Sequence, residues 1–213
     1  MYIPKHFLQE DKLHIIGFMK QYSFASIISL QDNIPVATHL PFVIEERNGG
    51  LALISHFARA NNQWRGIEQQ IPLVIFAEPH AYISPRHYDT ELNVPTWNYA
   101  AVHAYGKAAI IPEEKKIMEV LEKTIQYYEA SYQKQWSQLP EKFKAGMIKG
   151  IVTFELTVTD LQAKYKLSQN RTDTEKKKII DSLKGSENAI DKKVGEMMQS
   201  GFTEKSLLKK HRY

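Results

Sequence analysis

The 213-residue chain contains no cysteine. This absence excludes a disulfide framework, a thiolate zinc site, an iron–sulfur cluster and a cysteine nucleophile. Any redox chemistry would therefore belong to a bound cofactor. The same absence fits the reducing cytosol, so we expect a cytoplasmic protein. Hydrophobic residues make up 43% of the chain, which is enough to build a folded core.

Long apolar runs are also missing. The longest one, Leu73 to Ala77, has five residues, whereas a membrane-spanning helix needs about 20. The opening residues, Met1 to His6, carry charge and proline where a signal peptide would have an unbroken apolar run. We therefore expect neither a membrane span nor a targeting segment.

Motifs of several enzyme classes are absent. The sequence has no GxSxG, Walker A or GxGxxG pattern. Seven of the eight histidines lie between His6 and His103, but no two are four residues apart and none forms an HExxH motif. We predict no bound metal.

Positive charge is unevenly distributed along the chain, whose formal net charge is +4. Residues 1–163 hold 15 basic and 17 acidic side chains, whereas residues 164–213 hold 13 and 7, a net charge of +6. This C-terminal region is consistent with a solvated, lysine-rich helical face or with an electrostatic footprint for nucleic acid. It contains no helix-turn-helix signature.

The hydrophobic pattern predicts strands separated by helices. Strand-like segments cover residues 26–30, 34–44, 51–57, 73–77, 97–111 and 152–158, and helical spacing marks residues 9–20, 58–70 and 112–132. Thr172 to Glu175 has the form of a capping box that opens a helix. We predict an α+β fold, mainly β, with inserted helices. Residues 1–170 would form an antiparallel barrel or sandwich, and residues 171–213 a basic helical appendage.

One polar segment stands at a predicted strand-to-helix junction, from Ser55 to Trp64. It contains His56, Arg59 and Asn61. Free N–H groups at a helix start and the planar guanidinium of arginine both suit a phosphate. The alternative is an ordinary helix start with a surface arginine.

Two further segments combine aromatic, polar and basic residues. In the stretch from Ile83 to Tyr99, Trp97 could stack on a planar ring, and Ser84, Thr96 and Asn98 could satisfy its polar edges. The alternative is a loop whose aromatic residues cover one end of the sheet. The segment Lys164 to Arg171, with Lys166 and Gln169, is either a phosphate contact or a solvated strand end.

Six sequence blocks, spread in order over about 170 residues, share the character of one known family. They are Met1–Phe7, Pro35–Pro41, Ala58–Trp64, Pro79–Pro85, Val94–Gly106 and Lys166–Asn170. Together they resemble the PaiB-type family of FMN-binding negative transcriptional regulators. The C-terminal region is similar to that family in order and character more than in motif.

This resemblance implies a flavin-reductase-like split β-barrel, usually a homodimer with FMN at the subunit interface. It also implies repression of genes for extracellular protease production and sporulation. On this basis we predict FMN contacts from nine residues: His56, Arg59, Asn61, Ser84, Thr96, Trp97, Asn98, Lys166 and Gln169. Binding of DNA by the basic C-terminal region is a separate expectation, motivated by its charge.

Two alternatives to a regulator remain open. A weaker similarity to pyridoxamine-phosphate oxidases allows a flavin-dependent oxidoreductase, with His87 or His103 as the proton-transfer group. The chain departs from those oxidases in having Ala100 and His103 where basic or amide residues would be expected. A haem-binding split barrel with a histidine axial ligand is the other alternative.

Overall fold

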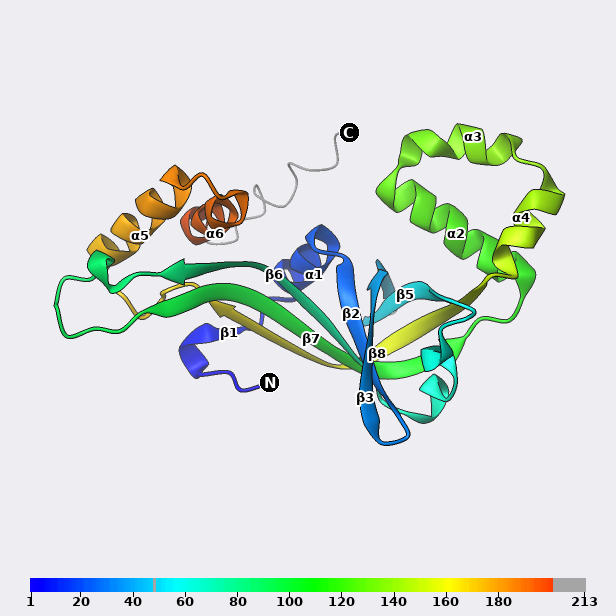
Figure 1. Ribbon diagram of the computed structural model, residues 1–213, viewed down its shortest axis with the longest axis horizontal. Helices are drawn as coiled ribbons and strands as arrows, with labels where there is room; N and C mark the ends of the chain where they lie inside the picture. The colour runs from blue at the N-terminus through cyan, green and yellow to red at the C-terminus, as the bar shows by residue number, and fades with distance from the viewer. Residues whose placement is uncertain (48, 201–213) are drawn as a thin grey trace. The chain divides into compact units, whose positions relative to one another are not determined.

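The computed structural model describes residues 1–47 and 49–200 of the chain. Its eight strands form one antiparallel sheet that is not closed, in the order β3-β2-β6-β7-β8-β5-β4, with β1 paired to β8 (Figure 1). The strands are β1 (Leu8–Gln9), β2 (Phe24–Gln31), β3 (Ile34–Pro41), β4 (Val43–Arg47), β5 (Gly50–Ala58), β6 (Leu73–Ile83), β7 (Thr96–Ile110) and β8 (Ile151–Lys166). This sheet with inserted helices confirms the predicted α+β class.

The helices fall between and after these strands. They are α1 (Lys12–Gln21), α2 (Glu114–Tyr128), α3 (Gln133–Gln138), α4 (Glu141–Ile148), α5 (Asp173–Gly185) and α6 (Ala189–Ser200). Short 3₁₀ turns are η1 (Lys5–Phe7), η2 (Asn62–Trp64), η3 (Ile67–Gln69), η4 (Pro85–His87) and η5 (Ala130–Tyr132). Among the described residues, no helix is long and apolar enough to cross a membrane.

The chain divides into two compact units. Unit 1 consists of residues 1–22 and 76–103 with the described residues from 162 onward, and unit 2 of residues 23–75 and 104–161. Helices α5 and α6 belong to unit 1. The predicted boundary at residue 170 stays a prediction, and residues 201–213 of the predicted appendage lie outside the described residues.

Unit 2 is built on a β2–β3 hairpin and the β4–β5–β8 strands. The hairpin turns at Asp32 and Asn33, whose φ angles of 51° and 63° match a tight turn between paired strands. Phe154 on β8 stacks on Phe57 of β5 in the core. At Gly106 of β7, an added Cβ would overlap backbone and side-chain atoms of β8, so only glycine permits this approach.

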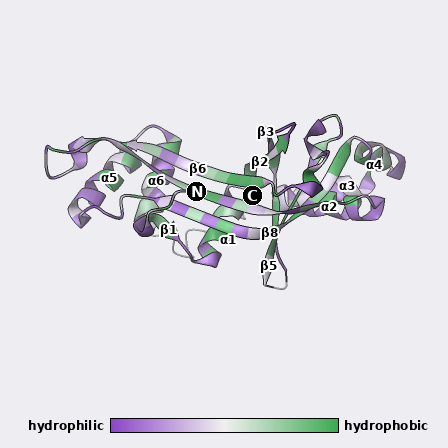
Figure 2. Ribbon diagram, turned by 90° about the horizontal axis from the view of Figure 1, so that it is seen from below, coloured by the Kyte–Doolittle hydropathy of each residue, from purple (hydrophilic) through white to green (hydrophobic). Residues whose placement is uncertain are grey.

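Unit 1 buries one face of its strands under helices (Figure 1). Phe18 of α1 packs on Tyr165 of β8 with ring centroids 5.4 Å apart. Thr172 and Glu175 form the predicted capping box at the start of α5, which is confirmed. Figure 2 shows hydrophobic and hydrophilic residues mixed along α5 and α6, in keeping with one packed and one solvated side. The opposite face of β6 and β7 carries the exposed side chains His80, Tyr82 and Trp97, and we call this part the open face.

The predicted helix over residues 58–70 is wrong. Strand β5 ends at Ala58 and is followed only by the single turns η2 and η3. The Asn61 side chain accepts a hydrogen bond from the Gln63 backbone N–H, which favours a turn over a helix. Gly66 adopts a φ of 75°, in the left-handed region, and stops any continuation.

Candidate functional site

In unit 2, Arg59 follows directly on β5 and is fixed by backbone carbonyls. Its Nε donates to Lys149 O at 2.6 Å and its Nη2 to Ile151 O at 2.8 Å. These two bonds use two of the five N–H groups of the guanidinium. The others have no partner among the described residues, and the side chain is exposed. Arg59 is thus oriented by the protein while keeping donors for an anion.

His56 lies on β5 directly opposite Thr153 of β8. Burial lowers the pKa of His56, which favours the neutral imidazole. The Thr153 hydroxyl is buried and has no hydrogen-bond partner within the described part of the chain. Opposed residues share one face of the sheet, so this pair leaves a polar position without a protein partner.

Asn61 is held within unit 2 by other side chains. Its Nδ2 donates to Thr38 Oγ1 at 2.8 Å, and its Oδ1 accepts from the Gln63 N–H at 2.9 Å. The structure therefore gives Asn61 a positioning role in the turn after Arg59. Its predicted contact with a cofactor stays a prediction.

In unit 1, the structure brings together Thr96, Trp97 and Lys166. Lys166 Nζ donates to the Thr96 hydroxyl, and to the Trp97 carbonyl at 2.8 Å. Burial lowers the pKa of Lys166, and the neighbouring charges of Lys164 and Arg171 lower it further. Lys166 has no carboxylate partner in the described residues. This end of β8 is therefore an electropositive position that lacks a counter-anion.

The Trp97 side chain is 51% exposed, although it is a large aromatic group. The His80 ring lies 5.8 Å from it, and the half-exposed Tyr82 ring 6.0 Å, at interplanar angles of 52° and 76°. These three rings occupy the open face of the strands β6 and β7. Such an exposed aromatic group provides a flat surface for a planar ring.

The remaining predicted residues of unit 1 bond mainly to the protein itself. Asn98 is fully buried and exchanges hydrogen bonds of 3.0 and 3.1 Å with the Ser168 hydroxyl. Gln169 accepts from the Leu167 N–H at 2.8 Å and so closes the turn after β8. Ser84 caps η4 at the end of β6. Gln169 and Ser84 therefore support neighbouring backbone, and Asn98 is held by the Ser168 side chain.

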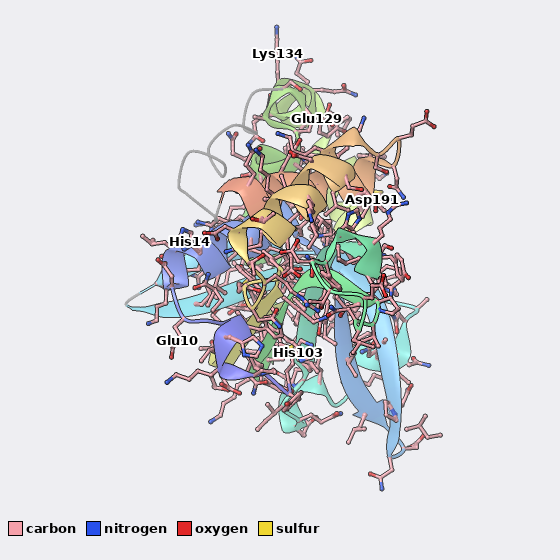
Figure 3. All side chains as sticks on the ribbon, turned by 90° about the vertical axis from the view of Figure 1, so that its left-hand side faces the viewer. Glu10, His14, His103, Glu129, Lys134 and Asp191 are labelled. Atoms are coloured by element: carbon pink, nitrogen blue, oxygen red, sulfur yellow. The ribbon has the colours of Figure 1, made fainter. Side chains whose placement is uncertain are left out.

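Two histidines were predicted for proton transfer in the oxidoreductase alternative. His103, labelled on β7 in Figure 3, has a buried Nδ1 without a partner among the described residues. Burial lowers the pKa of His103, and the N-terminal ammonium adds to this effect. His87 lies on η4, where burial lowers its pKa and Arg86 and Lys178 lower it further. Both imidazoles thus favour the neutral form.

Two residues of structural importance were not singled out from the sequence. Gln63 is 5% exposed and bonds to both strands of the β2–β3 hairpin. Ser168 is 4% exposed, binds Asn98 and has a φ of 61°. Both lie in the sequence blocks that carry the family resemblance, but only their long-range partners reveal what they do.

The comparisons with known proteins decide the family. A family model described as "Putative FMN-binding domain" matches residues 1–160. The chain is also 40% identical over 202 residues to the "Protease synthase and sporulation protein PAI 2" of Bacillus subtilis, covering 93% of this chain and 97% of that one. The chain belongs to this FMN-binding family. Membership in a family described by FMN binding confirms the predicted flavin cofactor.

Solved structures support the fold. The flavocytochrome Anf3 from Azotobacter vinelandii matches with a TM-score of 0.62 at 16% identity, covering 77% of this chain and 72% of that one. The FAD and heme binding protein from Mycobacterium smegmatis matches with a TM-score of 0.57 at 13% identity, covering 74% and 72%. At these identities the matches show the fold alone, and that fold confirms the predicted split barrel.

The residues of this FMN-binding family member fit a cofactor with a planar ring and a phosphate. Trp97 offers an exposed aromatic surface, and Lys166 a cation without a counter-anion. Arg59 offers guanidinium donors that its carbonyl partners leave free. The buried hydroxyl of Thr153 offers a polar group without a partner. Each unit by itself therefore offers groups that suit a part of FMN: unit 1 an aromatic surface and a cation, and unit 2 guanidinium donors.

Proposed function

We propose that the protein is a cytoplasmic, FMN-binding transcriptional regulator of the protease synthase and sporulation repressor type. The cofactor part rests on the exposed Trp97 ring and on Lys166, which donates to the Trp97 backbone carbonyl and is a cation that no described carboxylate neutralises. The regulatory part rests on the 40% identity to the Bacillus subtilis protein, whose name refers to protease synthesis and sporulation.

In this proposal Trp97 supports the isoalloxazine ring. Thr96 and Lys166 present a hydroxyl and an ammonium to polar atoms beside it. Arg59 binds the phosphate, because its guanidinium is oriented by two carbonyls and retains free donors. His56 presents a neutral imidazole. When bound, FMN would supply one- and two-electron redox chemistry, and the chain would hold and orient it.

The phosphate contact can be tested with two ligands. FMN and riboflavin share the ring and differ in the phosphate, so both would be titrated against wild type and Arg59→Gln by flavin fluorescence. Loss of a phosphate contact should weaken FMN about 10- to 100-fold and leave riboflavin unchanged. Lys107→Gln, which removes an exposed lysine on β7, is the matched control and should bind FMN like wild type.

Loss of a contact with the isoalloxazine ring should affect both ligands, because FMN and riboflavin share that ring. Trp97→Ala should weaken FMN and riboflavin equally, by about 3- to 10-fold. Wild-type protein that neither purifies with flavin absorbance nor quenches added FMN would refute the cofactor proposal. Steady-state oxidation of NAD(P)H by the flavin-loaded protein would favour the oxidoreductase alternative over the regulator.

We propose further that the protein acts as a homodimer, as the family resemblance implies. Light scattering coupled to size-exclusion chromatography should give twice the chain mass of 24.6 kDa. A monomeric mass across the micromolar range, with and without FMN, would rule the dimer out.

DNA binding is proposed for the basic C-terminal region. The residues described in this region, 164–200, hold nine basic and six acidic side chains, and residues 201–213 hold four and one, so each part carries +3. Several lysines of α5 and α6 are paired with acids: Lys176 with Asp173 at 2.7 Å, and Lys193 with Glu196 at 2.6 Å. The paired lysines contribute less to a field that attracts DNA.

The test follows from this charge distribution. Lys205, Lys209 and Lys210 would be changed together to glutamine, and three exposed lysines of unit 2, Lys115, Lys134 and Lys142, would serve as the charge-matched control. Affinity for promoter DNA should fall less steeply with salt in the first variant, by about 2 to 3 in the log–log slope. An equal effect of both triple variants would show non-specific attraction and contradict the proposal.

A further inference from the structure

A polar cavity of about 450 Å³ lies within unit 1, between η4 and the α5–α6 pair. Ile83 of β6 with Ile179 and Leu183 of α5 provide an apolar floor. Polar side chains from three elements surround this floor. The volume is within the usual range for small-molecule sites.

Arg86 of η4 supplies a cation to this cavity. Its guanidinium has no hydrogen-bond or ion-pair partner among the described residues, and only its backbone N–H is bonded, to Ser84 Oγ. His87 also lines the cavity; burial lowers its pKa, and the charges of Arg86 and Lys178 lower it further. Lys178 is neutralised by Asp89 at 2.8 Å, whereas Arg86 is not.

Asp191 of α6, labelled in Figure 3, supplies an acceptor from a different element. One of its oxygens, Oδ2, accepts from the Ser186 hydroxyl at 2.8 Å, and no lysine or arginine among the described residues forms an ion pair with it. The Ser84 and Ser182 hydroxyls also line the cavity. The site therefore offers one free cation, hydroxyl donors and one carboxylate.

From this arrangement we propose that the cavity binds a small phosphorylated metabolite that also carries hydroxyl groups. The phosphate would pair with Arg86, with hydrogen bonds from the serine hydroxyls. A ligand hydroxyl would donate to Asp191, a contact that a bare anion does not make. Tyr82 also borders the cavity, and its ring lies 6.0 Å from the Trp97 ring on the other face of the strands.

Three probes test the ligand chemistry by calorimetric titration of the full chain. They are glycerol 3-phosphate, inorganic phosphate and glycerol. Glycerol 3-phosphate should bind most tightly, inorganic phosphate more weakly, and glycerol not measurably. The absence of saturable binding of all three at concentrations up to about 10 mM would overturn the proposal.

Two variants locate the binding. Arg86→Gln should weaken glycerol 3-phosphate by about 10-fold or more, since a charge-assisted contact is lost. Gly185→Met should block the cavity without strain, because a Cβ at Gly185 meets no atom within 4 Å. If both variants bind like wild type, the site is elsewhere and the proposal fails.

Two controls separate this site from other anion contacts. Lys177→Gln removes an exposed lysine of α5 outside the cavity and should leave binding unchanged. An equal loss in this variant would show general charge attraction and overturn the proposal. Arg59→Gln should also keep glycerol 3-phosphate binding, so failure of the flavin proposal and failure of this one are measured independently.

Discussion

Replacing Gln63 with leucine should strongly destabilise unit 2. The Gln63 side chain is buried, and its Nε2 donates to Ile27 O at 3.0 Å, to Ser29 Oγ at 3.1 Å and to Val36 O at 3.2 Å. Its Oε1 accepts from the Thr38 hydroxyl. One amide thus connects η2 to both strands of the β2–β3 hairpin. Leucine has a similar size, so the change removes the hydrogen bonds and leaves little cavity.

The magnitude follows from the number of bonds. The two amide protons and one carbonyl oxygen of Gln63 sustain three independent hydrogen bonds, and each contributes about 1 kcal/mol net, so the free energy of unfolding should fall by about 3 kcal/mol. This is a large fraction of the 5–15 kcal/mol that is typical of a folded domain. With a urea m-value of about 2–3 kcal/mol/M, the midpoint should fall by roughly 1–1.5 M.

Urea denaturation followed by circular dichroism measures this shift. Gln138→Leu, the same change at an exposed position of α3, is the matched control and should stay within about 0.5 kcal/mol of wild type. A double-mutant cycle with Thr38→Val should give a coupling of at least about 0.5 kcal/mol, because the two side chains bond directly. If Gln63→Leu shifts the midpoint no more than the control does, the amide is not supporting the hairpin and the reasoning is refuted.

Three further outcomes are expected. Gly106→Ala should lower the free energy of unfolding by about 1–3 kcal/mol, because the added methyl group would overlap atoms of β8. Gly146→Ala, in open space on α4, should raise that free energy by up to about 1 kcal/mol, and urea midpoints check both changes. Burial lowers the pKa of His56 in the folded protein, so below about pH 7 the unfolded chain binds a proton more readily than the folded chain does. The free energy of unfolding should therefore fall on acidification, and it should fall less in His56→Gln. Urea midpoints of both proteins at two pH values will show this difference. Arg171→Gln should speed proteolysis of the segment before β7, because the guanidinium lies 3.6 Å from the Tyr88 ring centroid; unchanged cleavage would contradict this.

Local signals predicted much of the fold. The turn at Asp32 and Asn33, the long strand β7 and the capping box at Thr172 each depend on neighbouring residues, and the structure has all three. The family resemblance added the split barrel and the flavin, which periodicity alone does not distinguish from other β-rich folds.

Long-range partners explain what local reasoning missed. The helix predicted over residues 58–70 does not form. Gly66 takes a left-handed conformation, and the Gln63 side chain bonds to Thr38 and Ile27, which precede it by 25 and 36 positions in the sequence. Asn98 and Ser168 are 70 residues apart in sequence and exchange two hydrogen bonds. A polar residue in a sequence pattern does not reveal whether it faces a ligand or another part of the chain, so the nine predicted contacts remain predictions.

The alternation of side chains along β7 nevertheless distinguishes two of the nine predicted FMN contacts, Trp97 and Asn98. Consecutive strand residues point to opposite faces, so the side chains of Trp97 and Asn98 do not share a surface. Trp97 is half exposed on the open face, whereas Asn98 is fully buried and donates to Met198 Sδ of α6 at 3.3 Å. Trp97→Ala should therefore weaken flavin with a small change in unfolding free energy. Asn98→Ala should lower that free energy by about 1–3 kcal/mol, because the Ser168 hydroxyl loses its buried partner. Equal stability losses in the two variants, measured by urea denaturation beside flavin titration, would show that this division between binding and support is wrong.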